Sequence, residues 1–375
     1  MRYLLSALRR DLAKKLVLLA GPRQCGKTTL AKSLLDQRGY YLNWDITNDR
    51  KIIRELAWPK DASLVVLDEF HKAPRWKNVL KGVIDQYGNK PPLLVTGSAR
   101  LDAFRVAGDA LTGRQYFYRL HPIDVAESAA FLPELPLRER VARLLQTGGF
   151  PEAFLNPVEA DRLRNDRMEI VTRDDLPDLS RISSWRRAVD LIELLRERVG
   201  KPVNFDNLAQ TLAISPPTAR AWVELLEKLY IVFLLPPYSR QLSRSIRKDR
   251  RVFFFDCGAA FDATGGAQLE NLVACSLLKW IHYRKDSAGE NWDLFYLRDK
   301  ESREVDFVVT RNRQVHWLIE VKTAEDTLSK HLAYYTEKLR PNAALQLVLH
   351  LDRPQERSGI NILPLAPWLA GLAIQ

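Results

Sequence analysis

Cysteine is scarce in this sequence of 375 residues, and long apolar runs are absent from it. Cys25, Cys257 and Cys275 have the spacing of neither a disulfide framework nor a zinc site. No run approaches the roughly 20 apolar residues that span a bilayer. The beginning of the chain interrupts short apolar runs with bases, unlike a signal peptide. We therefore expect a cytoplasmic protein that is not inserted in a membrane.

Bases outnumber acids in the chain. Lysine and arginine number 57 against 46 aspartates and glutamates, which gives a formal net charge of +11. Hydrophobic residues make up 46%, an ordinary globular content, and the length allows two or three domains. A basic surface attracts polyanions, so we expect a nucleic-acid partner, with DNA favoured. Within residues 239–251, the bases Arg244, Arg247 and Lys248 form either a phosphate-contacting strip or a solvated loop.

Residues 16–28 have the order of a strand, a glycine-containing loop and the start of a helix. Five apolar residues precede a full match to the phosphate-binding loop pattern, Gly21-Pro22-Arg23-Gln24-Cys25-Gly26-Lys27-Thr28. Such a loop turns its backbone N–H groups toward phosphates, and the following helix directs its positive dipole end at them. Lys27 is predicted to reach the β- and γ-phosphates, and the Thr28 hydroxyl to ligate magnesium. Residues 21–29, including Thr29, are the predicted nucleotide-binding site.

Acidic and hydroxyl residues follow the next apolar segments. In "SLVVLDEFHK", Asp68 is predicted to hold the hydrated magnesium ion and Glu69 to polarise the attacking water. The alternative is that two acids only terminate a strand. Thr96 and Ser98 end the segment "PPLLVTGS", either as γ-phosphate sensors or as part of a turn. Arg114 follows a glycine, and it would either reach the γ-phosphate bound to a neighbouring subunit or form a salt bridge.

Strands and helices alternate through the first third of the chain, which predicts a mostly parallel sheet with helices on both faces. Further on, residues 187–200 have the periodicity of a helix. Two helices joined by a tight turn and followed by an apolar strand then predict a winged helix-turn-helix, with Ser215 as a helix cap. In a DNA reader Thr218, Arg220 and Trp222 would face the bases. The alternative is a module for packing or protein contact.

The segment "REVDFVVTRNRQVHWLIEVK" predicts a β-hairpin. Asp306 and Glu320 come close to facing each other across it, and Glu320 and Lys322 leave the same face. Glu270 lies in the first turn of a predicted helix that packs on this sheet. A nuclease-type metal site needs converging carboxylates and a lysine near the scissile phosphate. The spacing by itself also fits a hairpin that merely carries charges.

Several segments together resemble a known family. "GPRQCGKTTL", "LDEFHK", "VTGSARLD" and "LTGRQYFYRLHPID", followed by "QLENLVACSLL", "EVDFVV" and "IEVK", resemble prokaryotic ATPases of the AAA superfamily that carry a C-terminal domain of unknown function. The resemblance implies ATP binding and hydrolysis, and a C-terminal fold similar to restriction endonucleases. By position it implies that Glu270, Asp306 and Glu320 ligate metal and that Lys322 supports the nucleophile. Cys257 departs from the family pattern at a turn that we expect to be buried.

These observations predict an α/β protein of several domains. The expected order is a P-loop NTPase parallel-sheet domain in residues 1–125, a helical linker or lid in 126–185, a winged-helix-like domain in 186–250, and a restriction-endonuclease-like α/β domain in 251–375.

The expected function is binding and hydrolysis of ATP with Mg²⁺, coupled to a C-terminal domain that binds nucleic acid and carries the residues of a metal-dependent nuclease. The alternative is a nucleotide-dependent switch that binds a protein or DNA partner without cleaving it. A small-molecule kinase fits less well because no acceptor-binding motif is present. The sequence leaves open whether the C-terminal site cleaves, which nucleic acid binds, whether Arg114 acts in trans, and whether the chain forms a homo-oligomer.

Overall fold

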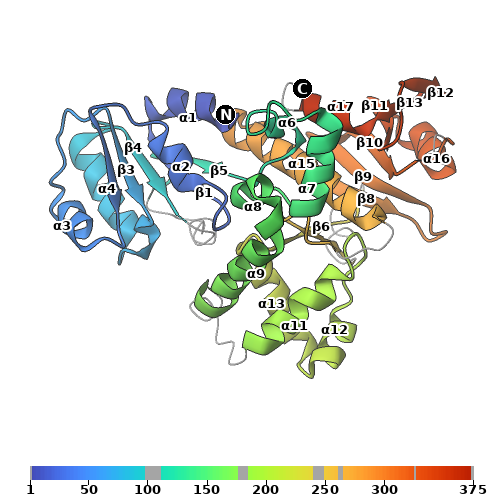
Figure 1. Cartoon of the computed structure of the whole chain (residues 1–375), viewed down its shortest axis with the longest axis horizontal. Helices are drawn as coiled ribbons and strands as arrows, with labels where there is room; N and C mark the ends of the chain where they lie inside the picture. The colour runs from blue at the N-terminus through green and yellow to red at the C-terminus, as the bar shows by residue number, and fades with distance from the viewer. Residues whose placement is uncertain are drawn as a thin grey trace. The chain divides into compact units, whose positions relative to one another are not determined.

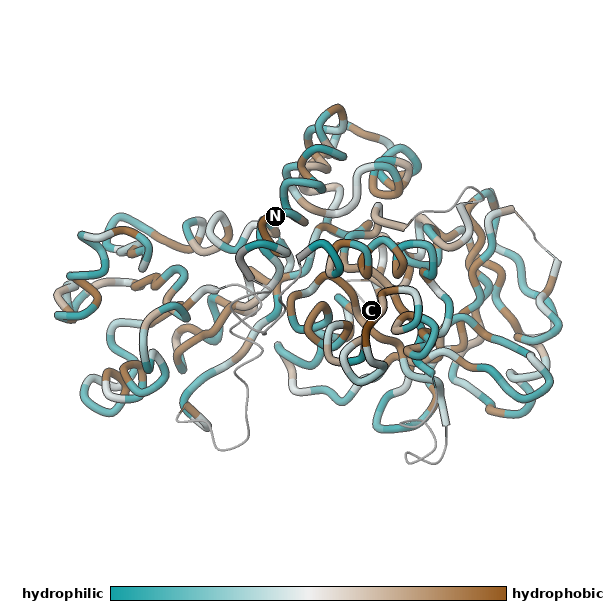
Figure 2. Tube along the Cα trace, turned by 90° about the horizontal axis from the view of Figure 1, so that it is seen from below, coloured by the Kyte–Doolittle hydropathy of each residue, from teal (hydrophilic) through white to brown (hydrophobic). Residues whose placement is uncertain are grey.

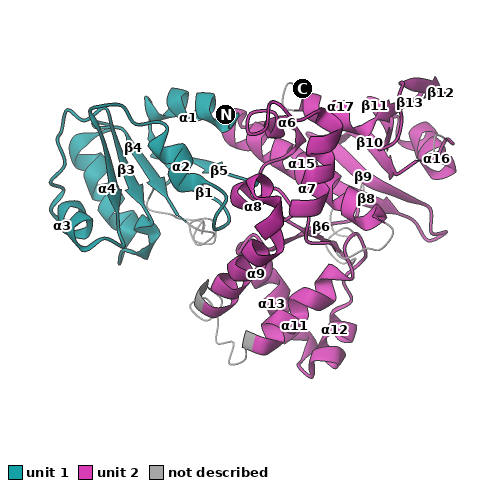
Figure 3. Cartoon of the chain, viewed as in Figure 1, with its two compact units in different colours: residues 1–122 teal, residues 123–375 magenta. Residues whose placement is uncertain are grey.

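A computed structural model describes residues 2–97, 111–175, 185–239, 249–260, 265–324 and 327–372 (Figure 1). The chain divides into two compact units, residues 1–122 and 123–375 (Figure 3). The predicted P-loop domain, residues 1–125, spans the first unit and the first three residues of the second. The three segments predicted beyond it all lie within the second unit.

A five-stranded parallel sheet forms the centre of the first unit, in the order β2-β3-β4-β1-β5. Its strands are β1 (Leu16–Ala20), β2 (Gly39–Asn43), β3 (Leu64–Asp68), β4 (Leu93–Thr96) and β5 (Gln115–Arg119). β1, β3 and β4 are buried along their whole length, as expected of strands covered on both faces. The predicted parallel sheet is therefore confirmed.

The helix α1 (Leu4–Leu12) precedes the first strand. Successive strands from β1 to β4 are connected by α2 (Lys27–Lys32), by α3 (Thr47–Glu55), and by the 3₁₀ turn η1 (Phe70–Lys72) with α4 (Trp76–Tyr87), as parallel pairing requires. Because the strands run in one direction, the carboxyl ends of β1, β3 and β4 meet at one edge of the sheet. The phosphate-binding loop, Asp68 and Thr96 are consequently brought to the same edge.

The second unit begins with short helices. They are α6 (Val125–Ser128), α7 (Leu137–Thr147), α8 (Pro151–Leu155), η2 (Pro157–Glu159) and α9 (Ala160–Ile170), which continues as the π-helical turn η3 (Val171–Asp175). Then come α11 (Trp185–Arg196), α12 (Phe205–Leu212), α13 (Pro216–Lys228) and the antiparallel pair β6 (Val232–Leu235) and β7 (Arg251–Phe254). The Ser215 side chain accepts a hydrogen bond from the Thr218 N–H and caps α13, as predicted. The winged-helix assignment itself stays a prediction.

A six-stranded mixed sheet, in the order β12-β13-β11-β10-β9-β8, forms the rest of the second unit. Its strands are β8 (Trp292–Arg298), β9 (Glu304–Arg311), β10 (Gln314–Lys322), β11 (Ala343–Val348), β12 (Gln355–Arg357) and β13 (Ile360–Pro364). Its helices are α15 (Gly266–Ala288), α16 (Lys330–Leu339) and α17 (Leu365–Gly371). β9 and β10 form the predicted antiparallel hairpin, and α15 contacts β8 and β10 through its buried stripe. The restriction-endonuclease-like assignment stays a prediction.

Hydrophobic and hydrophilic residues are interleaved along the helices of the second unit (Figure 2). Among the described residues, no helix combines the length and the apolar character needed to cross a membrane.

A buried ionic cluster joins α9 to the turn after β7. The Asp256 Oδ2 atom accepts hydrogen bonds from Arg164 Nε at 3.2 Å and Arg167 Nη2 at 2.5 Å. All three side chains are at least nine-tenths buried. Gly148 makes room for the carboxylate, because a Cβ atom there would lie 1.7 Å from Asp256 Oδ1. Cys257 lies in the same turn and is buried, which agrees with the expectation for this position.

Replacing Asp256 with asparagine is expected to destabilise the second unit by about 3 kcal/mol, because two buried guanidinium groups lose their carboxylate. Asp161→Asn is the matched control. Asp161 also pairs with Arg164, at 2.6 Å, but its side chain is 89% exposed. Exposed pairs contribute about 0.5 kcal/mol. Urea unfolding followed by tryptophan fluorescence measures both changes, and equal losses in the two variants would contradict the assigned role of burial.

Candidate functional site

The phosphate-binding loop runs from Gly21 to Gly26, between β1 and α2. Gly26 adopts a φ of 94° at the N-cap of α2, a conformation that favours glycine. The buried Lys27 ammonium donates hydrogen bonds to the carbonyl oxygens of Gly21 at 3.0 Å and Pro22 at 2.6 Å. Two carbonyl oxygens of the loop itself thus surround the lysine charge.

Arg2 supports the loop from a position that the sequence did not indicate. Its Nη2 atom donates to the carbonyl oxygens of Cys25 at 2.6 Å and His121 at 2.7 Å. Arg2 and Cys25 are buried, so a charged group bridges two chain segments inside the unit. A lone arginine near the start of the chain belongs to no recognisable motif. This contact therefore lay beyond sequence reasoning.

The Asp68 carboxylate accepts hydrogen bonds from hydroxyl groups on three neighbouring elements. Its Oδ2 atom accepts from Thr28 Oγ1 at 2.7 Å and from the Tyr41 hydroxyl at 2.5 Å, and its Oδ1 atom accepts from Thr96 Oγ1. Burial acts to raise the pKa of Asp68, but the hydrogen bonds from Thr96, Tyr41 and Thr28 outweigh it and lower the pKa below its usual range. The structure thus brings Thr28, Asp68 and Thr96 together. Sequence reasoning missed Tyr41.

Glu69 follows directly and adopts a left-handed backbone conformation, with a φ of 55°. Its Oε2 atom lies 3.2 Å from the Lys72 ammonium, which also contacts Asp45 Oδ2 at 2.5 Å. The Glu69 side chain is 24% exposed. The predicted water-polarising carboxylate is thus close to the phosphate-binding edge and has a cation beside it.

The remaining predicted residues of this unit lie further out. Arg114 forms an exposed pair with Asp85 on α4, with Nε and Oδ1 3.0 Å apart, so its role toward a neighbouring subunit stays a prediction. Thr29 is exposed on α2. Ser98, the second predicted sensor, lies outside the described residues.

Gly21→Ala is expected to reduce ATP turnover by about 100-fold, the effect of misplacing a reacting group by about 1 Å. A Cβ atom at Gly21 would lie 2.3 Å from the Leu120 carbonyl oxygen and 3.2 Å from Cys25 Sγ, so the loop has to move. Gly82→Ala on α4 is the control, since nothing lies within 4 Å of its added Cβ. A steady-state ATPase assay compares the two, and wild-type turnover in the Gly21 variant would contradict the prediction.

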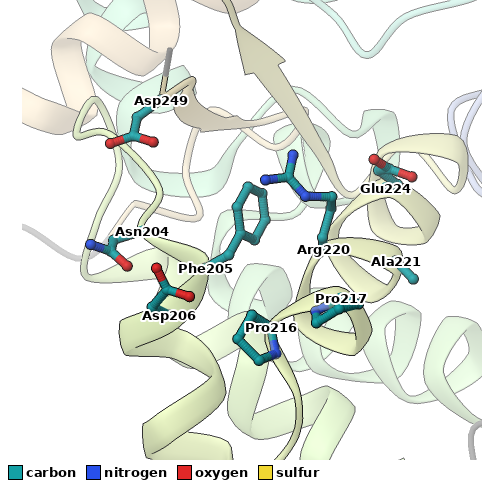
Figure 4. A pocket seen from close by; sticks show the side chains of 9 residues that line it. All are labelled: Asn204, Phe205, Asp206, Pro216, Pro217, Arg220, Ala221, Glu224 and Asp249. Carbon is teal, nitrogen blue, oxygen red and sulfur yellow. The ribbon is translucent and has the colours of Figure 1, made fainter. Parts of the chain in front are cut away.

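Arg220 occupies a pocket between the starts of α12 and α13. The pocket has a volume of about 520 Å³. The Arg220 guanidinium lies over the Phe205 ring, 4.3 Å from its centroid, and the carboxylates of Asp206, Glu224 and Asp249 lie around these two side chains (Figure 4). These three carboxylates outnumber the single guanidinium. The pocket therefore favours a cation over a phosphate.

The other predicted nucleic-acid contacts are Thr218 and three bases of the segment between β6 and β7. The Thr218 hydroxyl lies 2.7 Å from Ser215 Oγ and belongs to the cap of α13. Arg244, Arg247 and Lys248 lie outside the described residues. DNA contact through α13 therefore stays a prediction.

The β9–β10 hairpin places two predicted acids, Asp306 and Glu320, opposite each other. Phe307 pairs with Ile319, and continuing this register by one step places Asp306 opposite Glu320. Asp306 Oδ2 accepts a hydrogen bond from the Val321 N–H at 2.8 Å, and Lys322 Nζ lies 3.0 Å from Glu320 Oε1. Glu320 Oε2 is buried and accepts no hydrogen bond from any described residue. One oxygen of this carboxylate is thus available to a further partner.

Glu270 completes a group of mutually repelling carboxylates. It reaches from α15 toward Gly200, where an added Cβ atom would lie 2.8 Å from Glu270 Oε2. Burial and the neighbouring Asp306 raise the pKa of Glu270 to about 8. Burial and the charge of Glu320 raise the pKa of Asp306 to about 7, and burial also raises the pKa of Glu320. The group therefore retains protons near neutral pH unless a cation compensates its charge.

A buried arginine lies near the carboxylates of Glu270 and Asp306. Arg251 on β7 is buried and pairs with Glu304, which shares a face of β9 with Asp306. The Arg251 guanidinium lies over the Tyr296 ring, 4.5 Å from its centroid. Within the described part of the chain, no three histidine, cysteine or acidic side chains have the arrangement of a ready metal site. The carboxylates would have to move closer together to share an ion.

Comparison with known families identifies the type of domain in the first unit. Residues 13–129 match an AAA domain, so the phosphate-binding loop, Asp68 and Glu69 belong to an AAA-type P-loop ATPase domain, as expected. Residues 138–269 match a domain of unknown function (DUF8612), and residues 265–368 match another (DUF4143). These two matches name no activity.

The chain also resembles individual proteins along most of its length. An uncharacterized protein of Mycobacterium tuberculosis is 25% identical over 360 residues, which cover 86% of this chain and 76% of that protein. An uncharacterized protein of Methanocaldococcus jannaschii is 26% identical over 293 residues, covering 64% of this chain and 60% of that protein.

Solved structures give weaker likenesses. A variant of Thermotoga maritima RuvB has a TM-score of 0.33 and 19% identity, covering 62% of this chain and 87% of its own. The ORC1 protein of Aeropyrum pernix in complex with DNA has a TM-score of 0.34 and 14% identity, covering 73% and 93%. Likenesses at these TM-scores support no conclusion about activity or partner.

Proposed function

We propose that the protein is a magnesium-dependent ATPase whose nucleotide state controls a nucleic-acid-binding second unit, with DNA as the favoured partner. The observation that carries the ATPase part is the bond between Thr28 Oγ1 and Asp68 Oδ2, next to Lys27 in an AAA domain. A hydroxyl and a carboxylate are the oxygen donors that Mg²⁺ prefers. These residues therefore fit a magnesium ion held by Thr28 directly and by Asp68 through water.

The residues have distinct roles in this proposal. Lys27 leaves the Gly21 and Pro22 carbonyl oxygens and binds the β- and γ-phosphates, whose developing charge it stabilises. Glu69 orients the attacking water and takes up its proton. The magnesium ion, when bound, neutralises phosphate charge. Coupling requires that the ATP-bound and ADP-bound first unit differ in their interactions with the second unit.

Lys27→Ala is expected to lower ATP turnover by about 100-fold or more, since it removes the cation that stabilises phosphate charge. Glu69→Gln is expected to retain ATP binding and to lose a similar factor in turnover, which is the contribution of a general base. A fluorescent ATP analogue measures binding, and phosphate release measures turnover, each with and without DNA or RNA.

Lys81→Ala, at an exposed position on α4, is the control for loss of one positive charge. Full turnover in the Lys27 variant would reject the proposed ATPase site. A wild-type rate that no DNA or RNA changes would reject the nucleic-acid coupling alone.

For the second unit we propose metal-dependent cleavage of a phosphodiester at Glu270, Asp306, Glu320 and Lys322. The buried Glu320 Oε2 atom without a hydrogen bond and the raised pKa values of Glu270 and Asp306 support this proposal, because both features call for a cation. Glu270, Asp306 and Glu320 would hold a magnesium ion, which supplies charge stabilisation and a more acidic water. Lys322 would stabilise the nucleophile and the phosphate beside it.

The double variant Asp306→Asn, Glu320→Gln is expected to lose Mg²⁺-dependent cleavage and to keep ATP turnover. It is also expected to lose stabilisation by Mg²⁺. Folding raises the pKa values of Glu270 and Asp306, so their joint contribution to stability is complete below pH about 3.8 and is lost as the pH rises through about 7 and then about 8. Mg²⁺ is expected to restore stability at pH 8 in the wild type but not in the double variant.

Cleavage of labelled DNA and RNA and thermal unfolding with Mg²⁺ or Mn²⁺ measure these effects. Glu301→Gln, on an exposed acid near β9, is the control. If the wild type cleaves neither single- nor double-stranded DNA or RNA with either metal, the nuclease proposal fails.

The alternative function is a nucleotide-dependent switch that binds a partner without cleaving it. Two observations favour it: the described residues contain no ready metal site, and the α12–α13 pocket carries an excess of carboxylates. Such a pocket suits a basic side chain of a protein partner. Nucleotide-dependent binding of a partner by a wild type that cleaves nothing would select this function.

A further inference from the structure

Tyr41 lies on the edge strand β2, outside the sequence patterns that mark nucleotide sites. Its hydroxyl donates to Asp68 Oδ2 at 2.5 Å, and Thr28 Oγ1 donates to the same oxygen at 2.7 Å. Parallel pairing of Tyr41 with Val66 fixes the height of the ring beside β3. The Lys32 ammonium, at the end of α2, lies over the ring, 4.3 Å from its centroid. The phenol is thus held between the helix after the phosphate-binding loop and Asp68.

The two oxygens of Asp68 have different partners. Oδ1 accepts from Thr96 Oγ1 and from the Glu69 N–H at 3.1 Å, whereas Oδ2 accepts from Thr28 and Tyr41. Asp68 is only 2% exposed, so bulk water has little access to it. If the Thr28 hydroxyl bound magnesium, Oδ2 would lose one of its two donors. Tyr41 would then remain as the protein group that orients this oxygen.

We infer that Tyr41 is a positioning residue for the magnesium ion, an inference that rests on the proposed ATPase function. Its hydroxyl holds the Asp68 carboxylate in the orientation that receives the hydrated ion. Groups that orient a metal ligand from behind typically affect metal affinity about 10- to 100-fold. Tyr41 touches neither nucleotide nor metal in this role, so its effect should depend on the magnesium concentration.

The test is Tyr41→Phe, with Tyr40→Phe as the matched control. Tyr40 precedes Tyr41 on the same strand, points to the opposite face and is 41% exposed. A fluorescent ATP analogue is titrated with Mg²⁺, which measures binding without turnover. The half-saturating Mg²⁺ concentration is expected to rise about tenfold in Tyr41→Phe and to stay unchanged in Tyr40→Phe. Nucleotide affinity at saturating Mg²⁺ is expected to match the wild type.

Lys32→Gln leaves the hydroxyl in place and removes the cation over the ring. It should raise the half-saturating Mg²⁺ concentration by a smaller factor and serves as the test if Tyr41→Phe does not fold.

Three results would overturn the inference in distinguishable ways. Equal Mg²⁺ dependence in Tyr41→Phe and the wild type would show that the hydroxyl has no positioning role. A loss of nucleotide binding that no Mg²⁺ concentration restores, with a lower unfolding temperature, would assign Tyr41 a purely structural role. A wild type whose nucleotide binding ignores Mg²⁺ altogether would instead reject the proposed function on which the inference depends.

Discussion

One buried carboxylate, that of Asp68, connects the elements on which the ATPase domain depends. Its oxygens accept hydrogen bonds from α2, β2 and β4, through Thr28, Tyr41 and Thr96. These contacts are compatible only with strands whose carboxyl ends are level, which the parallel register of β2, β3 and β4 provides. The nucleotide-binding edge is therefore a property of the sheet as a whole, and not of the loop alone.

The sign of the net charge of the whole chain differs from the sign of the charge at two local sites in the second unit. The formal net charge is +11, yet carboxylates dominate both the α12–α13 pocket and the group around Asp306. A carboxylate group that raises its own pKa values is costly, and proteins keep such arrangements chiefly where a cation is used. The excess of bases lies in the first unit, because residues 123–375 contain equal numbers of bases and acids. The second unit thus has local sites suited to cations without an overall positive charge.

Much of the ATPase edge could be predicted because its signals are local. The Leu16–Ala20 strand, the glycine loop and the Asp68 strand each depend on residues adjacent in sequence, and they form the predicted elements. The Asp306–Glu320 register was also predictable, because a short turn fixes it.

The remaining contacts depend on residues far apart in the chain. Arg2 reaches His121, and Arg167 reaches Asp256, although no periodicity or motif links these positions. Arg220 is a residue that sequence reasoning did single out, but whose surroundings it could not foresee. Its type and helix position suggested a contact with DNA bases, which stays a prediction. The carboxylates around it come from three separate segments, so the negative charge of the pocket could not be read from the helix alone.

The buried ionic cluster of Asp256, Arg164 and Arg167 restricts which substitutions the neighbouring positions can accept. A methyl group at Gly148 would overlap the Asp256 carboxylate, and one at Gly258 would lie 2.5 Å from the Gly148 nitrogen. Two guanidinium groups fix that carboxylate, so the neighbours have little room to adjust. Recombination between relatives would therefore have to exchange residues 148, 164, 167, 256 and 258 together. Residues 148–167 and residues 256–258 are thus expected to be inherited as a unit.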